Sequence, residues 1–323
     1  MLSRRTFVAA LALGGVALLG WQAISQEIKT VAVTAIVEHP ALDAARNGIR
    51  DELAAAGYEE GHNLDLLFES AQGNPAIAAQ IARKFVGDAP DVIVPISTPS
   101  AQAVVGATKD IPVVFTAVTD PVGARLVTNL ERPGGNVTGM SDRSPIGLHL
   151  DLIRAIAPAA RRLGVIYSPG EANSVSLLEL IRKEAPARGL EIVEAAAPRA
   201  ADVLPAAQRL VGNVDAVYVP TDNTVVTALE AVVRVGTDHQ LPVFAGDTAS
   251  VPRGAIAALG FNYYDLGRQT GKIVVRVLEG AKPGDIPVEG VRITELYLNP
   301  GAAEAMGVTI PPEMLERARF VVE

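Results

Sequence analysis

The sequence predicts an α/β protein made of two doubly wound parallel-sheet lobes that several chain segments join as a multi-strand hinge. Two observations carry this prediction. Apolar runs of strand length alternate with amphipathic helices along most of the 323 residues, which is typical of parallel sheets covered by helices on both faces. The order of elements also repeats once, because Asp91-Val-Ile-Val-Pro95 resembles Asp215-Ala-Val-Tyr-Val-Pro220, 124 residues further on. A chain of this length has room for two domains of ordinary size.

The first half begins with an apolar strand at residues 31–37. A helix follows at residues 42–56, with apolar residues along one face and Gly57 at its end. Pro75 fits the first turn of the next helix, which extends to Phe85. The other elements expected in this half are strands at 64–68, 91–95 and 112–117 and a helix at 97–107.

The second half repeats that order. Its expected elements are strands at 163–167, 191–195, 215–219 and 242–245 and helices at 173–188, 203–211 and 223–235. Each half is followed by surplus segments that we expect to cross between the lobes, with hinges near 139–141, 259–262 and 298–300. The first lobe then comprises residues 27–140 with 261–298, and the second comprises residues 141–260 with 299–323.

Residues 1–26 have the features of an export signal. Arg4 and Arg5 precede an uncharged, largely apolar stretch, and Ala23-Ile24-Ser25 offers the small residues at which a signal peptidase cleaves. The adjacent arginines also fit the twin-arginine route, and an uncleaved membrane anchor is a third interpretation. Export of a chain without cysteine suits a bacterial periplasm, so we expect the protein there.

Composition and motifs exclude several classes of function. The formal net charge is −8 and no segment concentrates Lys or Arg, so we expect no nucleic-acid partner. The lack of cysteine excludes disulfides, thiolate metal sites and a cysteine nucleophile. The sequence contains no HExxH, GxSxG or P-loop motif, and it predicts no catalytic residue, no metal site and no cofactor.

Polar residues follow the predicted strands, at the edge where open parallel sheets bind their ligands. After the strand at 91–95, Ser97 or Thr98 would cap a helix that has Pro99 in its first turn, with Ser100 next. Free N–H groups and the positive end of the helix dipole make this turn a seat for a carboxylate. The alternative is a plain helix cap that no ligand uses.

The same rule selects residues after the other strands. Asp222 and Asp247 together would suit an ammonium group, and Gly246 allows a close backbone approach. Aspartates at strand ends equally cap helices, or act as acid and base in an enzyme. Phe115 and Phe244 are expected in the core. The remaining candidates for ligand binding are Glu38, His39, Thr119, Asp120, Asn173, Ser174, Thr221 and Asn223, with Tyr167 and Tyr263 as pocket walls.

Several motifs taken together resemble one family. They are Val37-Glu-His-Pro-Ala-Leu-Asp43, Ser97-Thr-Pro-Ser-Ala101, Val118-Thr-Asp-Pro121, Asn136-Val-Thr-Gly139, Tyr167-Ser-Pro-Gly-Glu-Ala-Asn-Ser174, Pro220-Thr-Asp-Asn223 and Tyr263-Tyr-Asp-Leu-Gly-Arg-Gln-Thr-Gly271. Over residues 29–323 the chain resembles the ABC-transporter substrate-binding proteins of the tryptophan/tyrosine-binding type. Members often carry a glutamine in the first strand near Ala35, where this chain has an apolar residue.

The resemblance implies a periplasmic-binding-protein type I fold with the ligand between the lobes. It implies that Thr98 and Ser100 hold a carboxylate and that Asp222 or Asp247 takes an amine. Tyr167, Asn173 and Ser174 would come from the other lobe.

The leading hypothesis is a monomeric periplasmic component of an ABC importer, which captures an amino acid or related carboxylate and docks on a permease driven by an ATPase. The alternatives are a ligand sensor for a membrane receptor and an exported enzyme that uses cleft aspartates.

Overall fold

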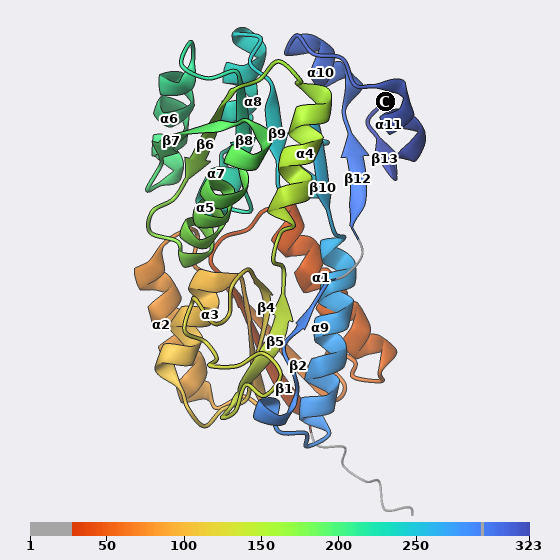
Figure 1. Ribbon diagram of the computed structural model, residues 1–323. Helices are drawn as coiled ribbons and strands as arrows, with labels where there is room; N and C mark the ends of the chain where they lie inside the picture. Colours follow the sequence, from red (N-terminus) through yellow and green to blue (C-terminus); the bar gives the residue numbers. More distant parts are fainter. Residues whose placement is uncertain (1–27, 292–293) are drawn as a thin grey trace, which may run out of the picture.

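The protein has two lobes stacked end to end, as a computed structural model shows for residues 28–291 and 294–323 (Figure 1). The first lobe contains a six-stranded sheet, and the second contains a four-stranded sheet next to a three-stranded one. The chain passes between the lobes after β5, after β10 and between β11 and β12. These features confirm two doubly wound lobes with a multi-strand hinge. The export signal predicted at residues 1–26 lies outside the described residues.

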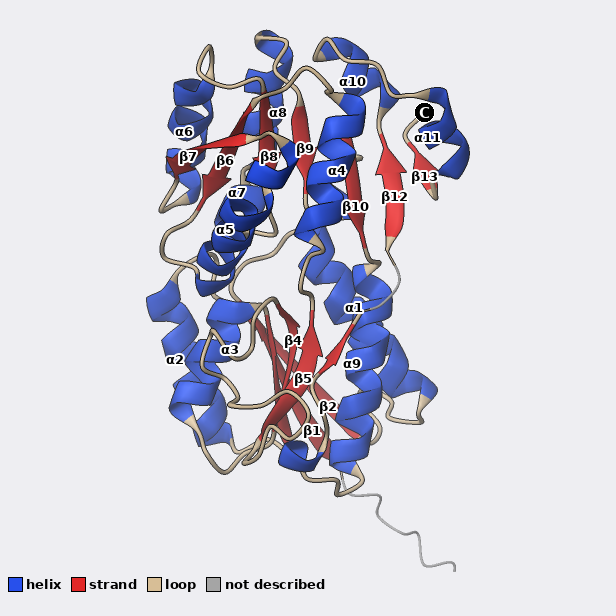
Figure 2. Cartoon of the chain, in the orientation of Figure 1, coloured by secondary structure: helices blue, strands red, loops and turns tan. Residues whose placement is uncertain are grey.

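The first sheet has the strand order β11-β5-β4-β3-β1-β2, and all of its neighbouring strands are parallel. Its strands are β1 (Lys29–Ala35), β2 (Leu64–Ser70), β3 (Val92–Ile96), β4 (Val113–Val118), β5 (Val137–Ser141) and β11 (Glu289–Gly290). The helices are α1 (Pro40–Ala55), α2 (Pro75–Asp88), α3 (Thr98–Ala107) and α9 (Tyr263–Leu278). Helices cover both faces of the sheet (Figure 2).

Both faces of this sheet are buried, which explains the unbroken apolar strands. On β1, Val31 and Val33 pack in the cluster that contains residues of α1 and α9, whereas Ala32 packs in the cluster that contains residues of α2 and α3. Successive side chains of a strand point to opposite faces, so a strand between two helical layers is largely apolar on both faces.

The second lobe repeats the topology of the first. Its parallel sheet has the order β7-β6-β8-β9, which matches β2-β1-β3-β4 strand for strand. Its elements are β6 (Arg162–Tyr167), β7 (Glu191–Ala196), β8 (Ala216–Val219), β9 (Val243–Ala245), α4 (Ile146–Ile156), α5 (Ala172–Glu184), α6 (Val203–Leu210), α7 (Asn223–Thr227) and α8 (Leu229–Asp238). The repeated aspartates are equivalent, because Asp91 accepts from Thr30 N and Asp215 accepts from Arg162 N, both at 2.8 Å.

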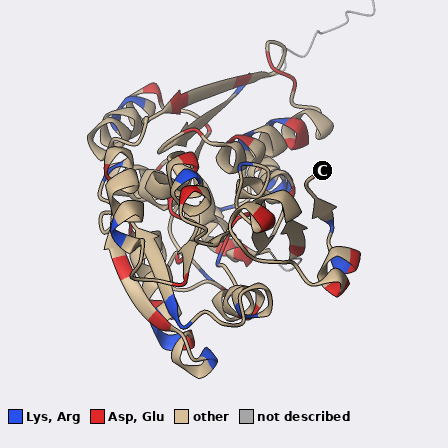
Figure 3. Ribbon diagram, turned by 90° about the horizontal axis from the view of Figure 1, so that it is seen from above, with Lys and Arg blue, Asp and Glu red and all other residues tan. Residues whose placement is uncertain are grey.

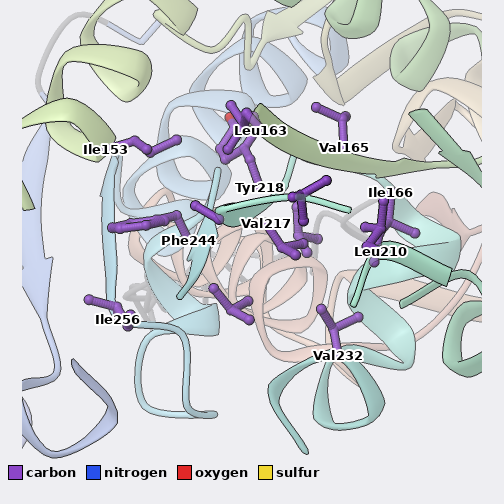
Figure 4. Close-up of a cluster of buried hydrophobic side chains, with 14 of the residues drawn as sticks. Ile153, Leu163, Val165, Ile166, Leu210, Val217, Tyr218, Val232, Phe244 and Ile256 are labelled. Atoms are coloured by element: carbon purple, nitrogen blue, oxygen red, sulfur yellow. The ribbon is translucent and has the colours of Figure 1, made fainter. Parts of the chain in front are cut away.

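Aromatic side chains of β8 and β9 pack in the largely aliphatic core of the second lobe (Figure 4). Tyr218 of β8 lies beside Phe244 of β9 in the sheet register, and both are buried among the aliphatic residues of the same cluster. Phe115 of β4 is fully buried in the first lobe. The expectation that Phe115 and Phe244 belong to the core is therefore confirmed.

The second lobe differs from the predicted elements by one divided helix and four missed elements. The helix expected at residues 223–235 is two helices, α7 and α8, because Ala228 leaves the helical conformation at φ −110° and ψ 27°. No glycine or proline marks that break, so the apolar pattern indicates one helix. The sequence also missed β10 (Ala257–Gly260), β13 (Phe320–Val321), α10 (Pro300–Ala305) and α11 (Pro312–Arg317).

Strand β12 (Glu295–Leu298) corrects one lobe boundary. Residues 261–298 were expected in the first lobe, but β12 pairs with β10 and β13 in the sheet of the second lobe. The third crossing therefore lies between β11 and β12, ahead of the predicted 298–300. Strand pairing joins residues far apart in the chain, so local periodicity cannot assign β12 to a sheet.

The surface carries both signs of charge. Lys and Arg are interspersed with Asp and Glu over the molecule (Figure 3). Over residues 28–291 and 294–323, no helix has both the length and the hydropathy that crossing a membrane requires.

Candidate ligand-binding site

A small cavity lies between the lobes, at the carboxyl ends of the strands of both parallel sheets. Open parallel sheets bind their ligands at this edge. The first lobe and the crossing segments contribute His39, Ala41, Leu42, Ala117, Thr119, Asp142 and Tyr263 to its wall. The second lobe contributes Asn173, Thr221, Asp222, Asn223, Val226 and Asp247.

The start of α3 lies beside this cavity. Ser97 occupies the N-cap position, yet its side chain makes no capping bond within the described chain. The hydroxyls of Ser97, Thr98 and Ser100 are buried and have no partner among the described residues. Ser97 N donates to Thr116 O at 2.9 Å, so this turn adjoins Ala117 on the cavity wall. The Ser97 side chain therefore does not cap this helix within the described chain, and the use of the three hydroxyls by a ligand stays a prediction.

Backbone strain marks the same two strand ends. Ser97 has φ +77° and Ala117 has φ +52°, in the left-handed region that residues with a side chain rarely adopt. Such strain costs about 1–3 kcal/mol per residue and persists where the surrounding structure enforces it, most often at binding sites. Ser97 directly follows β3 and Ala117 lies near the end of the adjacent β4, so the strain is at the edge of the sheet next to the cavity.

Three buried carboxylates line the cavity: Asp142, Asp222 and Asp247. Asp142 accepts from Thr119 Oγ1 and from Tyr263 OH, each at 2.9 Å. Burial raises the pKa of all three aspartates, with hydrogen bonds acting in the opposite direction. Among the described residues, no salt bridge joins Lys, Arg or His to any of them. A cationic group in the cavity would stabilise their ionised forms.

Asp222 belongs to a network at the start of α7. It accepts from Ser174 Oγ, from Ser168 N at 2.6 Å and from Val225 N at 2.8 Å. The adjacent Glu171 accepts from Thr224 N at 2.9 Å. Burial and the Glu171 charge together raise the pKa of Asp222 to about 7. Ser174 therefore orients Asp222, and Glu171 is a second carboxylate of this network that the sequence did not select.

Unpartnered polar atoms also face the cavity from both lobes. His39 Nδ1, Asn173 Oδ1 and Thr221 Oγ1 are buried, and none of them has a hydrogen-bond partner in the described part of the chain. The predicted close approach at Gly246 is confirmed, because a Cβ there would lie 3.1 Å from Thr221 N and 3.0 Å from Tyr218 OH. A larger residue would push the turn at residues 220–223 out of place.

Asp120 contacts the other lobe rather than the cavity. Its Oδ2 accepts from Ser176 Oγ of α5 at 3.0 Å, and its Oδ1 accepts from Gly123 N at 2.9 Å. The first of these bonds joins the loop after β4 of the first lobe to a helix of the second. Asp120 therefore contributes to the contact between the lobes.

The structure brings together part of the predicted set. The predicted residues on the cavity wall are His39, Thr119, Asn173, Thr221, Asp222, Asn223, Asp247 and Tyr263. Ser97, Thr98 and Ser100 lie beside the wall, Glu38 is exposed, and the ring of Tyr167 packs against the core of the second lobe. The sequence missed Ala41, Leu42, Ala117, Asp142 and Val226. Asp142 directly follows β5, so the strand-end rule could have found it.

The chemistry of the cavity suits a zwitterion. Hydroxyl donors at a helix N-terminus favour a carboxylate, and buried carboxylates favour an ammonium group. In residues 28–291 and 294–323, no three His, Asp or Glu side chains are grouped as metal ligands would be. Two repeated lobes that enclose such a cavity define a two-lobed solute-binding protein.

Comparison with known proteins identifies the family. The family model described as ABC transporter substrate binding protein matches residues 30–322, and the chain belongs to that family. Its fold is the periplasmic-binding-protein type I fold. The chain is 41% identical to a tyrosine-binding protein of Clostridioides difficile over 282 residues, which are 87% of this chain and 82% of the relative.

Two solved structures give a further comparison. The ABC domain from Streptococcus pneumoniae in complex with L-Trp matches with a TM-score of 0.89 and 36% identity, over 92% of this chain and 100% of that one. The ligand-free, open structure of a substrate binding protein with adhesive properties from Clostridium difficile matches with a TM-score of 0.69. That chain is 39% identical, and the match covers 91% of this chain and 99% of that one.

Proposed function

We propose that this protein is the solute-capturing component of an ABC importer and that its ligand is an aromatic L-amino acid. The carrying observation is the cavity, whose wall contains three buried aspartates and adjoins the unpartnered hydroxyls at the start of α3, so that both charges of a zwitterion have partners. The relatives narrow the ligand class, because one is named as tyrosine-binding and another contains L-Trp. Tyr263, Leu42 and Val226 offer apolar surface for the side chain of such a ligand.

The arrangement of the lobes fits capture by closure. The TM-score is higher for the complex with L-Trp than for the open, ligand-free structure, although the two identities are similar. The bond between Asp120 and Ser176 likewise requires the lobes to be close. A ligand that binds the closed form more tightly than the open form shifts the equilibrium between them by that difference in affinity.

Catalysis is not part of this proposal. Asp222 and Asp247 accept bonds from N–H and hydroxyl groups that cap the helical turns at residues 222–225 and 247–250. This use favours binding over proton transfer, so the ligand would leave unchanged. We further propose that the N-terminal segment exports the chain to the periplasm, where it acts as a monomer and delivers its ligand to a permease and an ATPase.

Native mass spectrometry of the freshly purified protein tests the ligand. We expect a co-purified aromatic amino acid and, after its removal, saturable binding of L-Tyr or L-Trp by calorimetry. Ligand at about 100 times its dissociation constant would add about 2.7 kcal/mol to the free energy of unfolding, which a melting curve detects. Binding of some other metabolite, with no response to any aromatic amino acid, would overturn the proposed ligand class.

A further inference from the structure

His39 is a polar group that lies beside apolar residues of the cavity wall. His39 precedes α1, whose Ala41 and Leu42 form apolar wall beside it, and Asn223 and Val226 come from α7 of the other lobe. Burial, aided by the positive charge of Arg253, lowers the pKa of His39 to about 4. The imidazole is therefore uncharged at neutral pH and cannot pair with a carboxylate of the ligand as a cation.

One ring nitrogen of His39 is left without a partner. His39 Nδ1 is buried and has no hydrogen-bond partner among the described residues. A neutral imidazole has one nitrogen that donates and one that accepts. In the tautomer with its proton on Nε2, Nδ1 is an acceptor that nothing else in the described chain uses.

We propose that His39 determines specificity by accepting, through Nδ1, a hydrogen bond from an O–H or N–H group on the ligand side chain. A buried acceptor without a donor is unfavourable, so a ligand that lacks the donor binds more weakly than one that has it. This inference rests on the proposed function and narrows it. The phenol of tyrosine and the indole N–H of tryptophan both satisfy Nδ1, whereas the ring of phenylalanine does not.

Matched ligand pairs test the role of His39. Each pair consists of a ligand with the donor and an analogue without it: L-Tyr with para-fluoro-L-phenylalanine, and L-Trp with benzothienyl-L-alanine. In the wild-type protein, calorimetry should show that the ligand with the donor binds at least about tenfold more tightly than its analogue. Each analogue keeps the size of the ring system and lacks the donor. In His39→Leu the two dissociation constants of a pair should differ by no more than about twofold. The change should come from weaker binding of the ligand that has the donor.

Two further variants give the controls. Leu42→Ala removes apolar wall next to His39 and should weaken both members of each pair while leaving the ratio unchanged. His39→Asn keeps a polar atom near the position of Nδ1 and should restore part of the preference. The N-cap His39 makes no capping bond in the described chain, so these substitutions do not remove a helix cap.

The outcomes separate this inference from the proposed function. If the wild-type protein binds aromatic amino acids but the ratio is near unity, or if His39→Leu weakens both members equally, the inference is wrong and the proposed function stands. If no aromatic amino acid binds, the proposed function itself fails. If His39→Leu does not fold, as judged by circular dichroism, the ratio of dissociation constants measured for each ligand pair with the wild-type protein tests the inference without the variant.

Discussion

Removal of the Ser176 hydroxyl should weaken ligand binding although Ser176 does not line the cavity. Its Oγ donates to Asp120 Oδ2 at 3.0 Å, and the two residues belong to different lobes. Because the bond exists only when the lobes are close, Ser176→Ala destabilises the closed form and leaves the stability of the open form unchanged. If the protein without ligand is mostly open, the ligand affinity falls by the same factor as the equilibrium constant for closing the lobes.

The size of the effect follows from the exposure of the bond. A hydrogen bond to a charged acceptor contributes about 1.5–3 kcal/mol when buried, and an ordinary one contributes about 0.5–1.5 kcal/mol. Both side chains here are half-buried, so screening by water reduces the value to about 1 kcal/mol. That free energy corresponds to an approximately fivefold higher dissociation constant for Ser176→Ala.

A double-mutant cycle measures this contribution. Calorimetry on the wild type, Ser176→Ala, Asp120→Ala and the double variant should give a coupling free energy of about 1 kcal/mol. Ser70→Ala is the matched control, because its hydroxyl accepts from Gln72 N within one lobe, and its affinity should equal that of the wild type. Additive effects of Ser176→Ala and Asp120→Ala would refute the idea that this bond stabilises the closed form.

Three other substitutions test the site. Gly246→Ala should weaken ligand binding at least about tenfold, because its Cβ would meet a backbone nitrogen at 3.1 Å, whereas Gly170→Ala, with an open position, should bind like the wild type. Tyr263→Phe leaves the buried Asp142 without one donor and should lower the free energy of unfolding by about 1–3 kcal/mol in urea titrations; an unchanged value would contradict the assigned bond. The pKa of Asp222 is raised from 3.8 to about 7, so the folded state keeps a proton that the unfolded state loses. The free energy of unfolding should therefore fall as the pH rises from about 4 to about 7, and urea titrations of Asp222→Asn should show a flatter pH dependence.

Much of the fold could be predicted from the sequence because its causes are local. Strands between two helical layers are largely apolar on both faces, and helices such as α1 bury one face, so both patterns are visible in short windows. The internal repeat then indicated two lobes of equal topology. The break between α7 and α8 was not predictable in this way, because Ala228 carries no signal for leaving a helix.

The candidate site was predictable only to the level of strand ends. The rule that ligands bind beyond the carboxyl ends of parallel strands selected Asp222, Asp247 and Thr119, all of which line the cavity. The same rule selected Tyr167 and Ser174, whose side chains turn to the core and to Asp222. Which way a side chain turns depends on neighbours from other elements, and those neighbours are far away in the sequence.

The sequence by itself determined the elements, the duplicated lobes and the polar turns that follow the strands, because each depends on residues close together in the chain. Only the tertiary structure decided the cavity wall and the partners of its charges. The lobes meet through contacts between distant segments, such as Asp120 with Ser176 and Tyr263 with Asp142. Such contacts depend on how whole sheets and helices pack, and local patterns carry no information about that packing.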